Sequence, residues 1–125
     1  MRTTARVPSE RDEQIALFQW AKVYQRMMPE LALLHHIPNG GSRNQIEAYN
    51  LKRQGVKPGV PDICLPIPNG QFSALYIELK RRKGGRLSDD QRGWIEALNR
   101  AGNRAVVCKG WEAARDEIIT YLRKG

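Results

Sequence analysis

Two acidic residues and one lysine stand in short apolar segments of this sequence, where charged side chains are uncommon. Asp62 follows Gly-Val-Pro in "GVPDICL", and Glu78 and Lys80 flank a leucine in "LYIELK". Two carboxylates at close range repel each other, and a bound divalent cation removes that repulsion. Such a cation can polarise a phosphoryl oxygen and help form a hydroxide nucleophile. These residue types therefore indicate metal-assisted hydrolysis of a phosphate ester, in which Lys80 orients or deprotonates the attacking water, or stabilises the developing negative charge.

The three side chains share one side of a sheet if both segments are strands, because side chains alternate between faces. In residues 74–80, Glu78 and Lys80 lie on the face opposite to Leu79. The turn sequence "PNGQ" between the segments predicts neighbouring strands, so Asp62 and Glu78 can face the same side. The alternative is an exposed Glu78–Lys80 ion pair on a half-buried strand, which is the usual explanation of an isolated E-x-K.

A glutamine near the start of a predicted helix has two interpretations. The tetrapeptide "SDDQ" at 88–91 matches a capping box, in which Gln91 satisfies a backbone N–H at the helix start. Gln91 also lies on the apolar stripe of that helix, with Trp94 and Leu98, so it can point into a site at the start of the helix. We favour the site role and keep the cap as the alternative.

Basic residues surround the acidic positions in the sequence. The net charge of +8 favours a polyanionic partner such as nucleic acid. Basic side chains can hold phosphates without reading base sequence, and the alternative is a solvated charged surface. The loop at 38–42 can contact phosphate or form an ordinary turn. The candidate DNA-contacting residues are Asn39, Arg43, Lys52, Arg53, Lys57, Arg81, Arg82, Lys83 and Arg86.

The elements that position these residues follow from apolar periodicity and turn residues. Helices are predicted at 10–28, 43–54, 88–101 and from 111 onward, and strands at 57–67, 72–80 and 104–109, with a strand candidate at 31–37. The order α-(β)-α-β-β-α-β-α predicts an α/β (mixed α+β) fold with a central mixed sheet flanked by helices. The last two strands should be parallel, because a helix connects them. Residues 1–125 are predicted to form a single domain.

Several classes of protein do not fit the sequence. We expect no membrane span and no signal peptide, because no apolar run has the required length. Cys64 and Cys108 lie far apart in apolar runs, so we expect reduced, buried thiols and a cytoplasmic setting. No Cys/His cluster indicates zinc, and no GxxxxGK[ST] loop indicates a nucleotide cofactor. His35 and His36 suggest a His-dependent nuclease, but no second ligand set accompanies them, so we interpret them as structural or solvent-facing.

The combination of "GVPD" with "IELK" resembles the PD-(D/E)XK nucleases. The segments "IPNGG" (37–41), "GVKPGVPD" (55–62), "IELKRRKGGRLSDDQ" (77–91) and "AGNRAVVCKGWEAAR" (101–115) further resemble the VRR-NUC branch, in its stand-alone phage and bacterial form, over nearly the whole chain. The resemblance implies a restriction-endonuclease-like core. It also implies an Mg²⁺ or Mn²⁺ ion bound by Asp62, Glu78 and the Leu79 carbonyl, with Lys80 as the catalytic lysine.

The resemblance extends the site to two further residues. It implies catalytic roles for Gln91 and for the first-helix acid before Gln14, which is Glu13 here. Helical periodicity alone does not separate Glu13 from Glu10, because both fall near the apolar stripe of the first helix. A solvated first-turn position is the simpler interpretation of Glu10.

These observations predict a metal-dependent DNA endonuclease, and the resemblance implies that a bacterium or phage encodes it. No helix-turn-helix or zinc finger is present to read base sequence, so we expect selection by DNA shape. The resemblance implies a homodimer that acts on branched DNA such as four-way junctions. Two alternatives stay open: a DNA-binding module without catalysis, and a structural subunit of a phage or repair complex.

Overall fold

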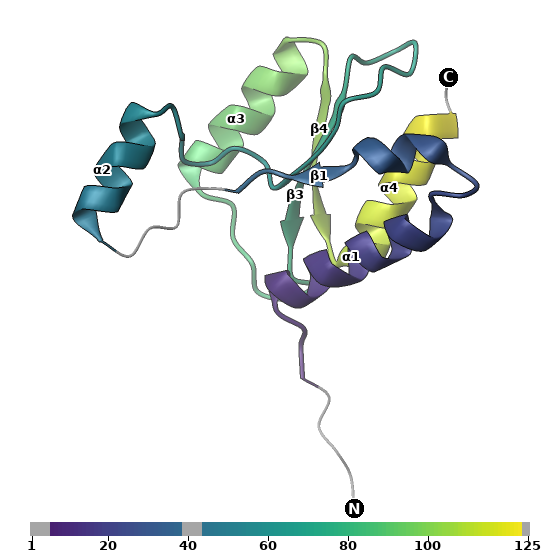
Figure 1. The fold of residues 1–125 in the computed structure, drawn as a ribbon, viewed down its shortest axis with the longest axis horizontal. Helices are drawn as coiled ribbons and strands as arrows, with labels where there is room; N and C mark the ends of the chain where they lie inside the picture. Colours follow the sequence, from purple (N-terminus) through teal and green to yellow (C-terminus); the bar gives the residue numbers. More distant parts are fainter. Residues whose placement is uncertain (1–5, 39–43, 124–125) are drawn as a thin grey trace, which may run out of the picture.

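The structure is a computed structural model that describes residues 6–38 and 44–123. Along the chain it contains α1 (Glu10–Tyr24), the 3-10 helix η1 (Pro29–Leu33), β1 (His35–His36), α2 (Gln45–Arg53), β2 (Ile63–Leu65), β3 (Leu75–Lys80), α3 (Asp89–Arg100), β4 (Arg104–Lys109) and α4 (Trp111–Arg123) (Figure 1). Apart from η1, this is the predicted order of elements, and the fold is the predicted mixed α/β fold.

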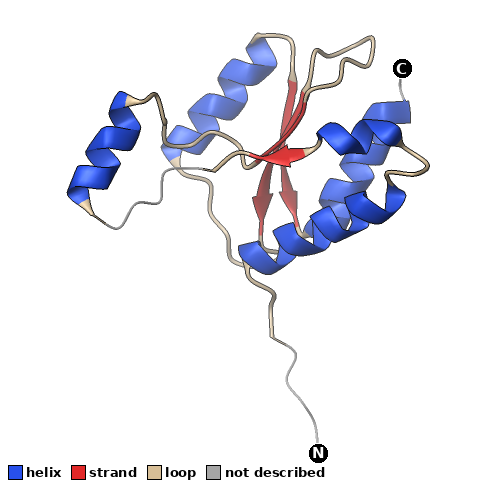
Figure 2. Cartoon of the chain, in the orientation of Figure 1, coloured by secondary structure: helices blue, strands red, loops and turns tan. Residues whose placement is uncertain are grey.

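The four strands form one mixed sheet in the order β1-β2-β3-β4 (Figure 2). β2 is antiparallel to both of its neighbours, and its register with β3 sets Ile63 beside Ile77. β3 and β4 are parallel, as predicted, with Lys80 beside Lys109. The loop between β2 and β3 turns at the "PNGQ" segment, where Asn69 Oδ1 accepts hydrogen bonds from the backbone N–H groups of Gln71 and Phe72. The two segments that carry the acidic residues are therefore neighbouring strands.

Several elements are shorter than the sequence pattern predicted. The predicted strand at 31–37 retains only His35–His36, because Pro29 starts a 3-10 helix that takes up residues 31–33. The first helix ends at Tyr24 instead of 28, ahead of the same proline. The strand predicted at 57–67 is reduced to Ile63–Leu65, because prolines on both sides cannot donate to a ladder. β3 begins at Leu75 instead of 72.

The hydrophobic core lies between the sheet and two packed helices. Figure 1 shows α1 and α4 together on one side of the strands and α3 on the other. Leu17 of α1 and Ile118 of α4 are fully buried against Ile63 and Ile77 of the sheet. As the alternation predicted, Leu79 faces this core, which leaves its neighbours Glu78 and Lys80 for the side of the sheet on which α3 lies.

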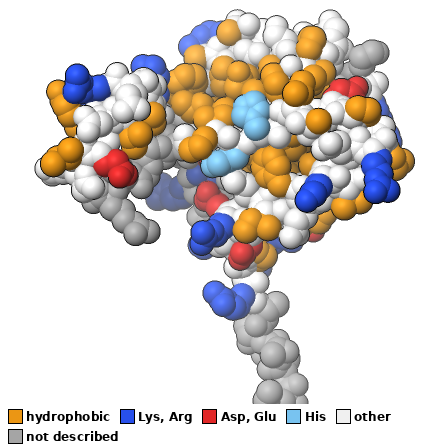
Figure 3. Space-filling model, viewed as in Figure 1, with side chains coloured by type: hydrophobic (Ala, Val, Ile, Leu, Met, Phe, Trp, Pro, Cys, Tyr) orange, Lys and Arg blue, Asp and Glu red, His pale blue; other side chains and the backbone are white. Residues whose placement is uncertain are grey.

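Helix α2 stands apart from the rest of the fold. None of its residues is buried, and the space-filling view shows it as a lobe beside the main body (Figure 3). Asn44 caps the helix through a hydrogen bond from the Glu47 backbone N–H to its side chain. In the described part of the chain, no helix has the length and apolar character needed to cross a membrane.

Candidate active site

Asp62 is held in place at the entrance of β2. Its backbone carbonyl accepts hydrogen bonds from the Ile37 N–H at 2.6 Å and from His36 Nδ1 at 2.9 Å. Its side-chain oxygen Oδ2 accepts from the Leu79 N–H at 3.0 Å. Pro61, which is fully buried, fixes the backbone immediately before it. Asp62 is thus attached to β1 through its backbone and to β3 through its carboxylate.

The backbone of Leu79 faces the same edge of β3 as Asp62. Consecutive residues of a strand direct their N–H and C=O groups to opposite neighbours, and the Lys80 carbonyl accepts from Gly110 N on the β4 side. Leu79 therefore faces β2. The β2–β3 register, extended by two residues, sets Pro61 opposite Leu79, and proline has no N–H to donate. The Leu79 carbonyl, which lies beside Asp62, therefore receives no strand-to-strand hydrogen bond from residue 61.

Glu78 has one carboxylate oxygen with hydrogen-bonding partners and one without. The side chain is buried, and its Oε2 accepts from Gln91 Nε2 at 3.0 Å and lies 3.6 Å from Lys80 Nζ. Within residues 6–38 and 44–123, Oε1 is the one buried side-chain nitrogen or oxygen that has no hydrogen-bond partner. Burial, followed by the charge of Asp62, raises the pKa of Glu78 to about 8, although Lys80 opposes the shift. Burial and the neighbouring carboxylate therefore disfavour the ionised form of Glu78, and a bound cation would favour it.

Gln91 joins the start of α3 to the end of β3. Its Oε1 accepts from Lys80 Nζ at 3.1 Å and from the Ser88 N–H at 2.9 Å, while its Nε2 donates to Glu78. Ser88 Oγ accepts from the Gln91 N–H at 3.1 Å, which completes the capping box. The cap and the contact with the site, which the sequence presented as alternatives, are both present.

The oxygen atoms at this end of β3 suit a hard divalent cation. Asp62 and Glu78 supply carboxylates and Leu79 a carbonyl, which are the ligand types that Mg²⁺ and Mn²⁺ prefer. No group of three or more His, Cys, Asp or Glu residues in the described chain is placed to hold a metal ion. A third protein ligand would therefore be a backbone oxygen, with water completing the shell. The unsatisfied Oε1 of Glu78 fits this arrangement, because a cation would give that oxygen a partner.

Glu13, predicted to be catalytic, is buried on α1 and held by groups far along the chain. Arg82 donates to its two oxygens at 2.8 and 3.0 Å, and the Trp111 N–H donates to Oε1 at 3.0 Å. Arg82 also binds Glu112 at 2.8 Å. Arg82, assisted by the Trp111 N–H, lowers the pKa of Glu13 in spite of its burial. The hydrogen bonds described for Glu13 connect three elements and do not reach the carboxylate pair, whereas Glu10 is exposed.

The basic residues predicted to contact DNA are held in different ways. The guanidinium of Arg82 is bound by two carboxylates, and Arg81 Nε donates to the Lys83 carbonyl at 2.9 Å in the turn after β3. The Arg53 guanidinium lies over the Tyr49 ring, 5.5 Å from its centroid. Residues with exposed side chains are Lys52, Arg53, Lys57, Arg81, Arg82, Lys83 and Arg86, whereas Asn39 and Arg43 lie outside the described residues.

Two contacts at the site had no signal in the sequence. His36 was interpreted as structural or solvent-facing, and its hydrogen bond to Asp62 depends on the pairing of β1 with β2. Gly59 is buried with a φ of +88°, and a Cβ there would lie 2.5 Å from the backbone carbon of Asp90. The segment before Asp62 therefore packs directly against the start of α3, and no pattern in the sequence predicts this contact.

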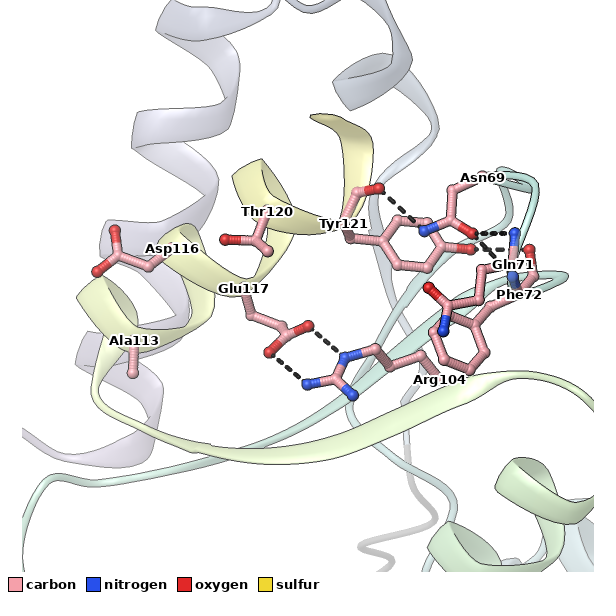
Figure 4. Close-up of a pocket in the computed structure, with 9 residues that line it drawn as sticks. All are labelled: Asn69, Gln71, Phe72, Arg104, Ala113, Asp116, Glu117, Thr120 and Tyr121. Atoms are coloured by element: carbon pink, nitrogen blue, oxygen red, sulfur yellow. Dashed lines mark hydrogen bonds and ion pairs between the residues drawn. The ribbon is translucent and has the colours of Figure 1, made fainter. Parts of the chain in front are cut away.

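A separate cleft of about 340 Å³ lies at the opposite end of β4 (Figure 4). Arg104 and Glu117 form two hydrogen bonds across it, at 2.6 and 3.1 Å. Asn69 donates to the Tyr121 carbonyl at 3.0 Å, and the Tyr121 hydroxyl donates to the Ile67 carbonyl at 2.7 Å. These bonds brace α4 against β4 and the β2–β3 loop, so we assign the cleft a structural role.

The sequence and the structure both match one family of known proteins. The family model of the VRR-NUC domain matches residues 3–112, a range that includes all of the proposed catalytic residues. A solved structure titled "VRR_NUC domain protein" is similar with a TM-score of 0.83 and 30% sequence identity, over 96% of this chain and 93% of the other. None of the curated proteins that were searched matches the sequence.

Proposed function

The chain belongs to the VRR-NUC domain family and is a nuclease-like domain, and we propose that it is a metal-dependent DNA endonuclease. The observation that carries the proposal is the pair of the half-buried Asp62 and the buried Glu78, in which Glu78 Oε1 has no hydrogen-bond partner. Such a group is costly to bury and is rarely retained without a compensating function. A cation at the pair would supply the missing positive charge.

Each residue of the site has a proposed task. Asp62, Glu78 and the Leu79 carbonyl would hold Mg²⁺ or Mn²⁺, which would supply Lewis-acid chemistry at the scissile phosphate and its attacking water. Lys80, 3.6 Å from Glu78, supplies a group that orients or deprotonates that water or stabilises the developing charge. Gln91 fixes the positions of Lys80 and Glu78 with one side-chain amide.

The substrate is proposed to be DNA, selected by its shape. The net charge of +8 and the exposed basic residues after β3 support a phosphate-binding surface, which carries no base specificity by itself. Branched DNA such as a four-way junction is the proposed substrate, and a homodimer would present two sites to two strands. Light scattering with and without junction DNA measures whether the protein is a dimer.

The proposal is tested by cleavage of labelled junction, flap and linear duplex DNA in Mg²⁺, Mn²⁺ or EDTA. We expect cleavage with either metal and none in EDTA, and we expect Asp62→Ala to abolish it. Glu78→Ala should stop cleavage while DNA binding persists. The proposed endonuclease activity would be rejected if Asp62→Ala cleaved at the wild-type rate, or if no substrate were cleaved with any metal. The second result, together with tight binding, would instead leave a DNA-binding module.

A further inference from the structure

Helix α2 carries an exposed surface that the proposed active site does not use. Ile46 is 76% exposed and Tyr49 62% exposed, and none of the residues in α2 is buried. Positions 46, 49 and 53 are three and four residues apart, so Ile46, Tyr49 and Arg53 follow one another along one face of the helix. Single exposed apolar residues are common on protein surfaces, but an aliphatic, an aromatic and a guanidinium group in one row form a defined surface.

The charge around this row is positive. Lys52, Arg53 and Lys57 are exposed at the end of α2 and just beyond it, and Glu47 is the one acidic residue within the helix. In Figure 3, hydrophobic and basic side chains both reach the surface of the lobe that α2 forms. A polyanion therefore complements this surface better than a basic or purely apolar partner does.

The base of α2 is attached to the proposed active site. Asp62 lies nine positions after Arg53 in the sequence, which limits the distance between them to about 30 Å. The connecting segment is fixed against α3 where Gly59 contacts Asp90, one residue before Gln91. The end of α2 thus lies within the length of about nine base pairs of the carboxylate pair, given a rise of about 3.4 Å per base pair, so one DNA molecule can reach both.

We infer that the row of Ile46, Tyr49 and Arg53 on α2 binds an unpaired nucleobase of branched DNA, which stacks on the Tyr49 ring beside Ile46. The inference rests on the proposed function and names a second contact for the same substrate. Intact duplex presents mainly phosphate and sugar to a side chain on its outer surface, and offers no free base face. An unstacked base at a branch point has such a face, and aromatic and aliphatic side chains bind it without reading its sequence. Arg53, over the same ring, adds a positive charge for the adjacent phosphate.

The test measures DNA affinity by fluorescence anisotropy in EDTA, with the full chain and three variants. Tyr49→Ala should bind a junction with unpaired bases at its branch about 5- to 150-fold more weakly, and fully paired duplex with nearly unchanged affinity. Tyr49→Phe is the matched control and should bind like wild type, because it keeps the ring. Lys52→Ala should weaken binding to both substrates and reduce the salt dependence, which Tyr49→Ala should leave unchanged. Because Tyr49 is exposed, its replacement should not change the unfolding midpoint.

A second measurement reports the stacking directly. 2-Aminopurine next to the branch point should change its fluorescence on binding wild type and Tyr49→Phe, and not on binding Tyr49→Ala. Equal affinity of wild type and Tyr49→Ala for the junction, or equal weakening on duplex, would overturn the inference. A wild-type dimer that becomes a monomer in Tyr49→Ala would also overturn it and would assign the face to a second copy. If wild type cuts DNA and Tyr49→Ala binds normally, the inference fails alone; if wild type neither binds nor cuts DNA, the proposed function fails with it.

Discussion

The surroundings of Glu78 disfavour a negative charge on its carboxylate. It is buried, lies next to a second carboxylate, and leaves one oxygen without a hydrogen bond. Each of these features disfavours the ionised form, and together they raise its pKa to about 8. A cation bound at this pair, as proposed, would offset the free energy that burying the carboxylate costs the metal-free protein.

Replacing Glu78 by Gln should therefore stabilise the metal-free protein while abolishing cleavage. The folded pKa of about 8 lies above the ordinary value of 4.5, so wild-type stability falls as pH rises from about 4.5 to about 8. Gln does not titrate, so the free energy of unfolding of Glu78→Gln should exceed that of wild type increasingly across that range, by on the order of 2–4 kcal/mol at its upper end. Urea unfolding in EDTA at pH 5 and pH 8 measures the difference.

Addition of Mg²⁺ is the control for this variant. The cation should raise the melting temperature of wild type and leave that of Glu78→Gln almost unchanged, because the variant lacks one carboxylate ligand. Equal pH dependence of the two proteins in EDTA would show that the Glu78 carboxylate is not the group responsible.

Gln91 and Ser88 allow the cap of α3 to be separated from the site. Ser88→Ala and Gln91→Ala each remove one half of the capping box and should each cost about 1 kcal/mol of stability. Only Gln91→Ala also removes the contacts with Lys80 and Glu78, so it should lower the cleavage rate by about 10- to 100-fold. Chemical denaturation and single-turnover cleavage provide the two readouts, and similar cleavage by both variants would limit Gln91 to the cap.

At the scale of the elements, two contacts set the geometry of the site. The Glu13–Arg82 pair connects α1 to the end of β3 and, through Trp111 and Glu112, to the start of α4. Gly59 brings the segment before β2 against α3. The first contact connects the carboxyl ends of β3 and β4 to α1 and α4. The second keeps the segment that carries Asp62 against the start of α3, where Gln91 lies.

Removing Arg82 should destabilise the protein in a pH-dependent way. Arg82→Ala leaves the buried Glu13 carboxylate with the Trp111 N–H alone, so the melting temperature at pH 7 should fall by several degrees. Because Arg82 lowers the Glu13 pKa in wild type, its contribution is present above pH 4.5 and is lost as the pH falls below that value. Thermal unfolding at pH 7 and pH 3 should show the gap between variant and wild type shrinking.

Arg92→Ala is the control for that experiment. Arg92 is exposed on α3, so its removal should leave the melting temperature nearly unchanged at both pH values. A gap for Arg82→Ala that stays constant down to pH 3 would mean that Glu13 ionisation does not contribute to the stabilisation by Arg82.

Gly59 and Gly70 test how much the contact with α3 matters. Both have a φ of +88°, but a Cβ on Gly70 would meet no atom within 4 Å, whereas one on Gly59 would meet the Asp90 backbone at 2.5 Å. Gly70→Ala should cost about 1–2 kcal/mol for the left-handed backbone alone. Gly59→Ala should cost more and also slow cleavage, because the segment that carries Asp62 must move. Equal losses of stability and normal cleavage in both variants would contradict this role of the Gly59 contact.

At the scale of the whole molecule, the net charge of +8 makes DNA binding dependent on salt. Lys83 is exposed in the turn after β3, so Lys83→Ala should reduce the slope of log K against log salt concentration by about one. Lys22→Ala is the matched control, because Lys22 lies nine residues along α1 from Glu13, or about 14 Å. Anisotropy titrations at several salt concentrations give both slopes, and an equal reduction for the two variants would mean that charge acts without a defined site.

The sequence by itself determined the residues of the carboxylate site and the order of elements around it. Strand alternation puts Glu78 and Lys80 on one face, and a turn between two short segments makes Asp62 their neighbour. The spacing in "SDDQ" places Gln91 in the first turn of a helix. All of these rest on local geometry, which repeats with a fixed period and needs no knowledge of the rest of the fold.

Only the tertiary structure decided which distant groups meet at and around the site. Glu13 meets Arg82 and Trp111 across 69 and 98 residues, and His36 meets Asp62 across 26. The tertiary structure also decided how far β1 and β2 extend, that α2 stands apart, and that Gly59 lies against α3. The physical reason is that periodicity fixes which face of an element is apolar but not which element covers it. Buried charge pairs are selected by the geometry of packing, which the sequence pattern does not encode locally.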